Sequence, residues 1–261
     1  MKTDTKHDRL WGIPVVIILI LVWEWTSRMG WVDSILLPAP SNIFVKLSGL
    51  FREAQIYADL GVTSYRFLAG YLIGCAIAIP LGLVMGISRK LYLSLDMLLE
   101  SLRPIPASAL IPIALLCFGL GDGMTVAIVA YAVVWPVLIN TIDGVRGVDS
   151  LLVDTGRVFG LNQRELVREI FIPASLPSVA TGMRISLALS ITLVIVVEML
   201  VGDQGLGHRI IDAERTFRFP EMYGLTFLIG VLGYTANRAF FAFSDTFIGW
   251  HRLAHEGTEW L

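Results

Sequence analysis

The sequence predicts an all-α membrane protein that crosses the bilayer with six helices. Three observations support this fold class: only 16% of the 261 residues are charged, 55% are hydrophobic, and long uncharged apolar stretches recur along the chain. The mean hydropathy is +0.71. Soluble domains carry about 25% charged residues, so the polar surface here is too small for a water-soluble enzyme or a disordered chain. The net charge of −2 also provides no basic field for nucleic acid.

The predicted spans follow from length and polarity. A helix needs about 20 mostly apolar residues to cross the hydrocarbon core. We expect one transmembrane domain over 1–261, with spans at about 10–28, 61–88, 95–119, 122–143, 174–201 and 222–248. The first apolar stretch follows charged residues, as in a cleaved signal peptide. However, no A-x-A-like site follows it, and tryptophans flank it as interfacial anchors do, which favours a span.

The distribution of Lys and Arg predicts the orientation. With the N-terminus inside, ten basic residues fall in inner segments and six in outer segments. Cytoplasmic loops carry the excess of positive charge, so both termini and the loop over 149–173 are expected in the cytoplasm.

That loop is predicted to form a helix-turn-helix elbow. Asp149 and Ser150 can cap a helix that ends at Gly160, because glycine readily takes the left-handed conformation that closes a helix. Apolar residues beside this end, Val158, Phe159 and Leu161, would suit a groove on another protein.

A second short helix should follow at once. Asn162 and Glu165 have the spacing of a capping box, in which each side chain accepts a hydrogen bond from the other residue's backbone N–H. Pro173 and Pro177 are expected to end this helix and to lead the chain back into the membrane.

The loop resembles the EAA loop of ABC importer permeases. The family pattern is E-A-A-x-x-x-G, then nine residues, then I-x-L-P. This chain has the glycine, the spacing, the isoleucine and the proline of that pattern in the segments 154–160 and 170–173, which are separated by nine residues. This chain departs from it with Asp154 for Glu, Thr155 and Gly156 for the two alanines, and Ile172 for Leu. Glycine lowers helix propensity by about 1 kcal/mol relative to alanine, so a looser first helix is expected.

Further segments are similar to the nitrate/sulfonate/taurine branch of that family. They are Leu37–Ser41, Leu102–Pro106, Trp135–Thr141, Ala174–Pro177, Val197–Leu200 and Gly205–Gly207. The resemblance implies a type I importer permease fold, a core of two permease copies, two cytoplasmic ATPase subunits, an external solute-binding protein and the bacterial cytoplasmic (inner) membrane. It also implies that an ATPase grips the elbow through Asp154, Gly156, Arg157, Val158, Phe159, Gly160, Leu161 and Pro173. No G-x-x-x-x-G-K-[ST] phosphate loop occurs in this chain, so we expect no cofactor here, with ATP and Mg²⁺ on the partners.

Polar residues in or beside the spans are candidates for the transport pathway, because ionisable groups in a membrane usually face the bundle interior, a cavity or a partner charge. The candidates are Arg103, Ser108, Asn140, Thr192 and Glu198. Glu198 could instead pair with a basic residue, and Arg66 and Arg184 are expected to snorkel to a membrane boundary. The glycine-rich segment 202–207 reads as an outer turn that faces the binding protein.

No catalytic or metal-binding set is predicted. His251 and His255 have a spacing compatible with a metal, but two ligands make a weak site, and no Ser/His/Asp set or intramembrane His pair supports an enzyme. The sequence therefore predicts the permease subunit of an ATP-driven importer for a small solute, with an anion favoured, acting as a homodimer. The alternative is a secondary transporter or channel that works without an ATPase.

Overall fold

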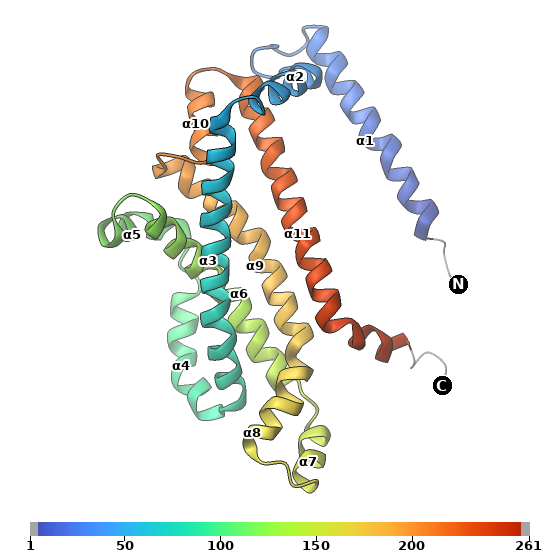
Figure 1. Ribbon diagram of the computed structural model, residues 1–261, viewed down its shortest axis with the longest axis vertical. Coiled ribbons are helices and arrows are strands. Elements are labelled where there is room, and N and C mark those ends of the chain that lie inside the picture. The colour runs from blue at the N-terminus through green and yellow to red at the C-terminus, as the bar shows by residue number, and fades with distance from the viewer. Residues whose placement is uncertain (1–4, 257–261) are drawn as a thin grey trace.

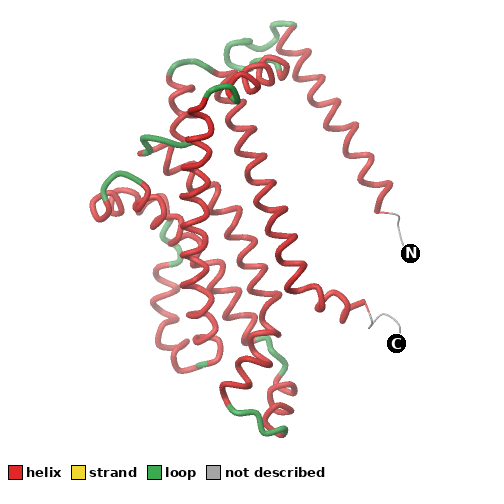
Figure 2. Tube along the Cα trace, in the orientation of Figure 1, coloured by secondary structure: helices red, strands yellow, loops and turns green. Residues whose placement is uncertain are grey.

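The computed structural model describes residues 5–256, with side chains described for residues 14–244. The described residues form helices and turns and contain no strand, which confirms the all-α class (Figures 1 and 2). In chain order the helices are α1 (Thr5–Arg28), α2 (Pro40–Leu50), α3 (Ala54–Ile87), α4 (Arg89–Leu102), the 3₁₀ turn η1 (Ala107–Leu110), α5 (Ile111–Phe118), α6 (Asp122–Arg146), α7 (Ser150–Val158), α8 (Gln163–Leu166), the π-helical turn η2 (Val167–Phe171), α9 (Ile172–Val201), α10 (Leu206–Arg215) and α11 (Phe219–Glu256).

The core of the molecule lies between α3, α6 and α9, which run along the long axis (Figure 1). Buried apolar side chains from all three helices form one cluster, with Phe67 and Met85 from α3, Val129 and Val137 from α6, and Val194 from α9 among them. Because these helices are apolar over most of their length, they can cross a membrane and still bury a shared face.

Glycines bring α3 and α6 into close contact. Gly70, Gly74, Gly82 and Gly86 lie on the face of α3 that meets α6, and a Cβ atom at any of them would come within 2.8 Å of a side chain of α6. Two pairs of these glycines are four residues apart, as in the small-xxx-small pattern that lets membrane helices approach closely. The two helices can therefore lie this close together only because these four positions carry no side chain.

The number of spans is only partly tested by the described residues. Four helical segments are long and apolar enough to cross a membrane: Ala54–Ile87, Asp122–Arg146, Gln163–Val201 and Phe219–Ser244. A fifth is reached if the bent pair of α4 with η1 and α5 counts as one span. The segment predicted over 10–28 lies in α1, whose side chains before residue 14 fall outside the described range, so six spans stay a prediction.

The span predicted over 95–119 is not one straight helix. The chain bends by 82° between α4 and the segment formed by η1 and α5. Pro104 and Pro106 lie in the connection, and a proline has no N–H to continue the helical ladder. The last hydrogen bond of α4 runs from the Arg103 N–H to the Leu99 carbonyl at 2.9 Å. The prolines thus leave α5 lying across the bundle instead of along it (Figure 1).

The two ends of the molecule carry different elements. Helices α2 and α10 lie at one end, and α7 and α8 form a protruding elbow at the other (Figure 1). Helix α1 contacts α2 and otherwise leaves most of its described apolar side chains exposed.

Candidate functional site

The first arm of the elbow is closed by hydrogen bonds at both of its ends. At the start of α7, the Asp149 carboxylate accepts from the Leu151 N–H at 2.9 Å. At its end, Gly160 takes the left-handed conformation (φ +82°), so the prediction for this glycine is confirmed. The Leu161 N–H donates to the Gly156 carbonyl and the Gly160 N–H to the Arg157 carbonyl, both at 3.0 Å. This pair of bonds is the Schellman motif.

The second arm begins with the predicted capping box. The Asn162 side-chain oxygen accepts from the Arg164 and Glu165 N–H groups at 3.0 and 3.1 Å, and the Glu165 carboxylate accepts from the Asn162 N–H at 2.7 Å. All these bonds join residues at most three positions apart, so they define the geometry of the turn without help from the rest of the fold.

The prediction that Pro173 and Pro177 end this second helix is wrong. The chain continues from α8 through η2 into α9 as one helical segment, Gln163–Val201. Pro173 lies in the first turn of α9, and the π-helical turn before it lets the Ile172 N–H donate to the Val167 carbonyl, five residues earlier. Such a turn is one way in which a helix accommodates a residue that cannot donate. The elbow is therefore joined to a membrane helix without a hinge loop.

Gly156 has a packing role that the sequence did not indicate. A Cβ atom at this position would lie 2.7 Å from the Ile170 Cδ1 atom and 2.8 Å from the Leu166 Cδ2 atom. The two arms of the elbow therefore meet at Gly156. Leu166 is buried at this contact. Leu161 was expected at the surface together with Val158 and Phe159, but it is half-buried and lies partly inside the elbow.

The tip of the elbow presents apolar side chains to the surroundings. Val158 and Phe159 are 86% and 82% exposed, although both are apolar. Asp154 and Arg157 form an exposed ion pair of 3.1 Å on the same arm. Pro173, by contrast, is half-buried at the start of α9 and away from the tip. Exposed apolar side chains on a rigid projection are typical of a surface that binds a partner.

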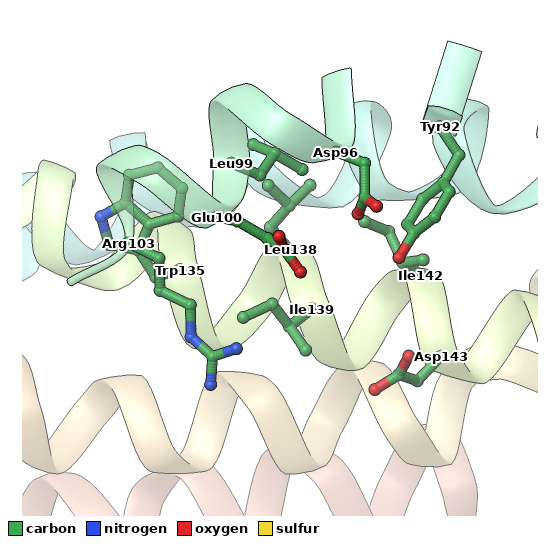
Figure 3. Close-up of a pocket in the computed structure, with 10 residues that line it drawn as sticks. All are labelled: Tyr92, Asp96, Leu99, Glu100, Arg103, Trp135, Leu138, Ile139, Ile142 and Asp143. Carbon is green, nitrogen blue, oxygen red and sulfur yellow. The ribbon is translucent and has the colours of Figure 1, made fainter. Parts of the chain in front are cut away.

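The predicted pathway residues are not brought together at one place. Arg103 lies exposed at the break after α4 and lines a cavity between α4 and α6 (Figure 3). Ser108 is exposed in η1, and the Thr192 hydroxyl, exposed on α9, donates to the Ala188 carbonyl. Asn140 is half-buried on α6, and its amide donates to the Pro136 carbonyl at 2.8 Å.

Glu198 is fully buried and bonded to protein donors. Its carboxylate accepts from the Thr63 hydroxyl at 2.9 Å, from Arg66 at 3.1 Å and from the Gly207 N–H at 3.0 Å. These contacts support the alternative prediction for Glu198, a pair with a basic residue. The glycine-rich turn makes room for the carboxylate, because a Cβ atom at Gly205 would lie 2.5 Å from it.

The expectation that Arg66 snorkels to a membrane boundary is wrong. Its side chain is buried and binds Glu198, the Asp122 carboxylate at 2.7 Å and the Gln204 carbonyl at 2.9 Å. A buried guanidinium is costly unless its donors are paired. Here the start of α6, the last turn of α9 and the turn before α10 supply the acceptors. Arg184 does lie exposed, with its guanidinium 4.2 Å from the Phe241 ring centre.

A second ionic cluster lies at the α2–α10 end. Arg209 of α10 binds Glu53, Asp59 at 3.5 Å and Glu221 at 3.1 Å. Burial lowers the pKa of this guanidinium, but hydrogen bonds to Glu53 and Glu221 outweigh that effect and leave the pKa above its usual value. Among the described residues no group of three His, Cys, Asp or Glu could hold a metal ion, and His251 and His255 lie outside the described side chains.

These features define a polytopic membrane protein with a rigid elbow that presents exposed apolar side chains at one end of its bundle. Residues 78–248 match the family described as "Binding-protein-dependent transport system inner membrane component". That match covers more than half of the chain, and the chain belongs to this family of ABC transporter permeases.

Relatives match over nearly the full length. The chain is 30% identical to the aliphatic sulfonates transport permease protein SsuC of Escherichia coli, over 94% of this chain and 92% of that protein. It is also 30% identical to the ABC transporter permease protein MJ0413 of Methanocaldococcus jannaschii, over 97% and 96% of the two chains. Among solved structures, an inward-facing MetNI methionine ABC transporter matches with a TM-score of 0.64 and 17% identity, over 74% of this chain and 96% of that one. This match supports the fold of an ABC importer permease.

Proposed function

We propose that this chain forms, as a dimer, the translocation pathway of an ATP-driven importer. A binding protein delivers a small anionic solute at the α2–α10 end, and two ATPase subunits grip the elbow in the cytoplasm. The membrane is the bacterial cytoplasmic membrane, with both termini inside. The exposed Val158 and Phe159 at the elbow's tip carry the proposal, because a rigid apolar projection is what a groove on another subunit can hold.

The way the elbow joins the bundle supports a role in energy coupling. Helix α9 continues directly from the second arm, and the first arm follows α6 after a short turn at Gly147. A displacement of the elbow would therefore move two core helices. When ATP closes the partner subunits, their grooves would draw the two elbows together and tilt the attached helices as rigid bodies.

Two further parts of the proposal concern the number of permease copies and the charge of the solute. One chain alone would give a thin pathway, so we propose two identical copies. The anionic class of the solute is supported by the name of the E. coli relative, a permease for aliphatic sulfonates, and by the resemblance to nitrate permeases.

The coupling role can be tested by charge substitution at the tip. We expect Phe159→Asp to abolish co-purification of the ATPase subunit and ATP-dependent uptake, because the carboxylate would have to be buried in an apolar groove. A matched control is Phe217→Asp, since Phe217 is 73% exposed and lies between α10 and α11, away from the elbow. This control should still co-purify with the ATPase.

Uptake that continues without any ATPase would refute the proposal and favour a secondary transporter or channel. Normal ATPase binding by the Phe159 variant would refute the assignment of the elbow.

A further inference from the structure

An apolar groove of about 340 Å³ lies where helices α1, α2 and α11 meet. All three helices contribute to its lining, which consists of Ile20, Trp23, Pro40, Ile43, Phe44, Leu47, Tyr223 and Phe227. The two polar groups of this lining offer little to a polar ligand, because the Trp23 Nε1 atom is buried and the Tyr223 hydroxyl donates to the Leu36 carbonyl at 3.3 Å. The volume is that of a ligand site, since pockets for small molecules begin at about 300 Å³.

Contacts within the chain hold the walls of this groove in place. The Glu24 carboxylate of α1 accepts from the Ser41 N–H at 3.0 Å and from the Ser41 hydroxyl at 2.8 Å, at the start of α2. A buried apolar cluster that includes Leu47 of α2 and Leu225 of α11 joins the other two walls. The groove is therefore a fixed feature of the fold and not a gap between mobile segments.

The groove lies between two apolar helices that separate below it. The Trp23 and Tyr223 rings stand edge to face, with their centres 6.1 Å apart, and below α2 helix α1 stands apart from α11 (Figure 1). Each side chain from Val15 to Val22 is 47–63% exposed, so α1 presents apolar surface on all of its sides. A buried water needs two to four polar partners, which this lining does not supply. In a bilayer, the acyl chains of lipids are the apolar molecules available to fill such a groove.

A basic side chain lies beside the groove. Lys46 directly precedes Leu47 on α2, and its ammonium group lies 3.7 Å from a Glu221 carboxylate oxygen, which is too long for a hydrogen bond. The Glu221 carboxylate already accepts from Arg209 at 3.1 Å and from Arg218 at 2.9 Å. The Lys46 side chain is 46% exposed and is thus free to meet a further anion. A lipid phosphate is complementary to a cation at this position.

We infer that the groove between α1, α2 and α11 binds one phospholipid, with an acyl chain along the apolar lining and the phosphate at Lys46. The lipid fills the space between α1 and α11 and so connects α1 to the bundle. Lys46 favours this occupant over an apolar helix of a second copy, because such a helix would cover the ammonium group without offering it an anion. The inference goes beyond the proposed function and requires only that the chain lies in a membrane.

The test is lipid binding to the full-length chain in detergent, measured by native mass spectrometry. The probes are dioleoylphosphatidylglycerol and dioleoylglycerol, which share their acyl chains and differ in the phosphoglycerol headgroup. We expect one phosphatidylglycerol per chain to bind before any further lipid. It should bind about fivefold tighter than the diglyceride, which corresponds to about 1 kcal/mol for one basic residue near an anionic headgroup.

Substitutions assign the two parts of the site. Phe227→Asp should weaken the first lipid at least tenfold, because a carboxylate would face the acyl chain. Phe243→Asp is the matched control, since Phe243 lies on the same helix, is 60% exposed like Phe227 and does not line the groove. Lys46→Gln should remove the preference for phosphatidylglycerol over the diglyceride, whereas Lys90→Gln, at an exposed position of α4, should keep it. Because Lys46 is partly exposed, its variant tests the site even if the Phe227 variant does not fold.

Lipids that add without a tighter first site would overturn the inference. So would equal lipid binding by the Phe227 and Phe243 variants, or a preference for phosphatidylglycerol that survives Lys46→Gln. A dimeric chain that binds no lipid would also overturn it and would show that a second copy covers the groove. The assay contains no ATPase and no solute, so its failure would leave the coupling role of the elbow standing.

Discussion

Replacing Gly74 by alanine should destabilise the bundle, although alanine is the better helix former. The new Cβ atom would lie 2.6 Å from the Val133 Cγ1 atom, 2.7 Å from the Val133 Cβ atom and 2.9 Å from the Ala130 carbonyl oxygen. Carbon atoms in contact are about 3.5–4.0 Å apart, so α3 and α6 would have to separate locally by roughly 1 Å. Rotation of Val133 could move its Cγ1 atom, but neither its Cβ atom nor the carbonyl.

The magnitude follows from two opposing effects. Overpacking costs about 1–3 kcal/mol, and this site should lie in the upper part of that range, about 2–3 kcal/mol, because the Val133 Cβ atom and the carbonyl cannot rotate away. The helix propensity of alanine returns about 1 kcal/mol, which leaves a net loss of about 1–2 kcal/mol. Gly61 lies on the same helix, and no atom lies within 4 Å of the place that a Cβ atom would take there, so Gly61→Ala should gain up to about 1 kcal/mol. The same substitution should thus change the stability in opposite directions at two positions of α3.

The assay is thermal unfolding of both variants in the same detergent. The fraction of folded protein that remains after heating is measured by size-exclusion chromatography. A change of 1 kcal/mol shifts the midpoint of a chain of this size by about 2–4 °C, so the Gly74 variant should unfold about 2–8 °C below the original protein. A midpoint for Gly74→Ala at or above that of Gly61→Ala would show that the contact between α3 and α6 is looser than described.

Three other predictions concern the polar groups. Glu198→Ala should lower the unfolding free energy by about 3–5 kcal/mol, because it leaves the buried Arg66 without one of its counter-charges; an unchanged unfolding midpoint would contradict this. Gly160→Arg should abolish ATPase co-purification without affecting membrane insertion, whereas Gly160→Asn should retain it, because asparagine tolerates the left-handed conformation; ATP-coupled uptake by the arginine variant would refute the assignment. Asn162→Ala should cost about 1 kcal/mol locally and speed hydrogen exchange at the Arg164 and Glu165 amides; unchanged exchange would show that the capping box does not hold the turn.

The elbow could be predicted from the sequence because its hydrogen bonds are local. Asp149, Gly160, Asn162 and Glu165 act on backbone groups no more than five residues away, so the spacing of residue types already contains the geometry. The course of the chain after the elbow was predicted less well. Pro104 and Pro106 break a helix, whereas Pro173 does not, because a π-helical turn absorbs its missing donor. Residue type alone does not separate these two cases.

The buried ionic network could not be predicted from local patterns. Arg66 and Glu198 are 132 positions apart, and the apolar context of each indicates only that a partner is needed. The glycine face of α3 did have a signal in the sequence. Gly70 and Gly74, and Gly82 and Gly86, are spaced four apart in an apolar segment, and that spacing is typical of close helix packing in membranes.

Under the proposed function, these contacts determine which parts of the bundle can move. The helical segment from Gln163 to Val201 is continuous, so the elbow and Glu198 lie near its opposite ends. At the Glu198 end, Arg66 of α3 binds both Glu198 and Asp122, and it thereby links this segment to α3 and to the start of α6. The glycine contacts fasten α3 to α6 along their length. A pull on the elbow would therefore displace the three helices together.

Helix α4 is connected to this unit differently. It packs on the core through apolar side chains such as Leu91 and Leu99 and through the stacking of Arg146 on Tyr92. The 82° bend after α4 means that it is not continuous with α5. Apolar contacts can slide where hydrogen-bonded ion pairs cannot without exposing a buried charge.

The Tyr131 hydroxyl of α6 also donates to the Leu102 carbonyl at the end of α4. Because no ion pair joins α4 to α6 among the described residues, relative movement at this boundary costs less than movement within the ion-paired unit of α3, α6 and α9. The cavity that Arg103 lines lies at this boundary, so a shift of the core driven from the elbow would change the width of this cavity.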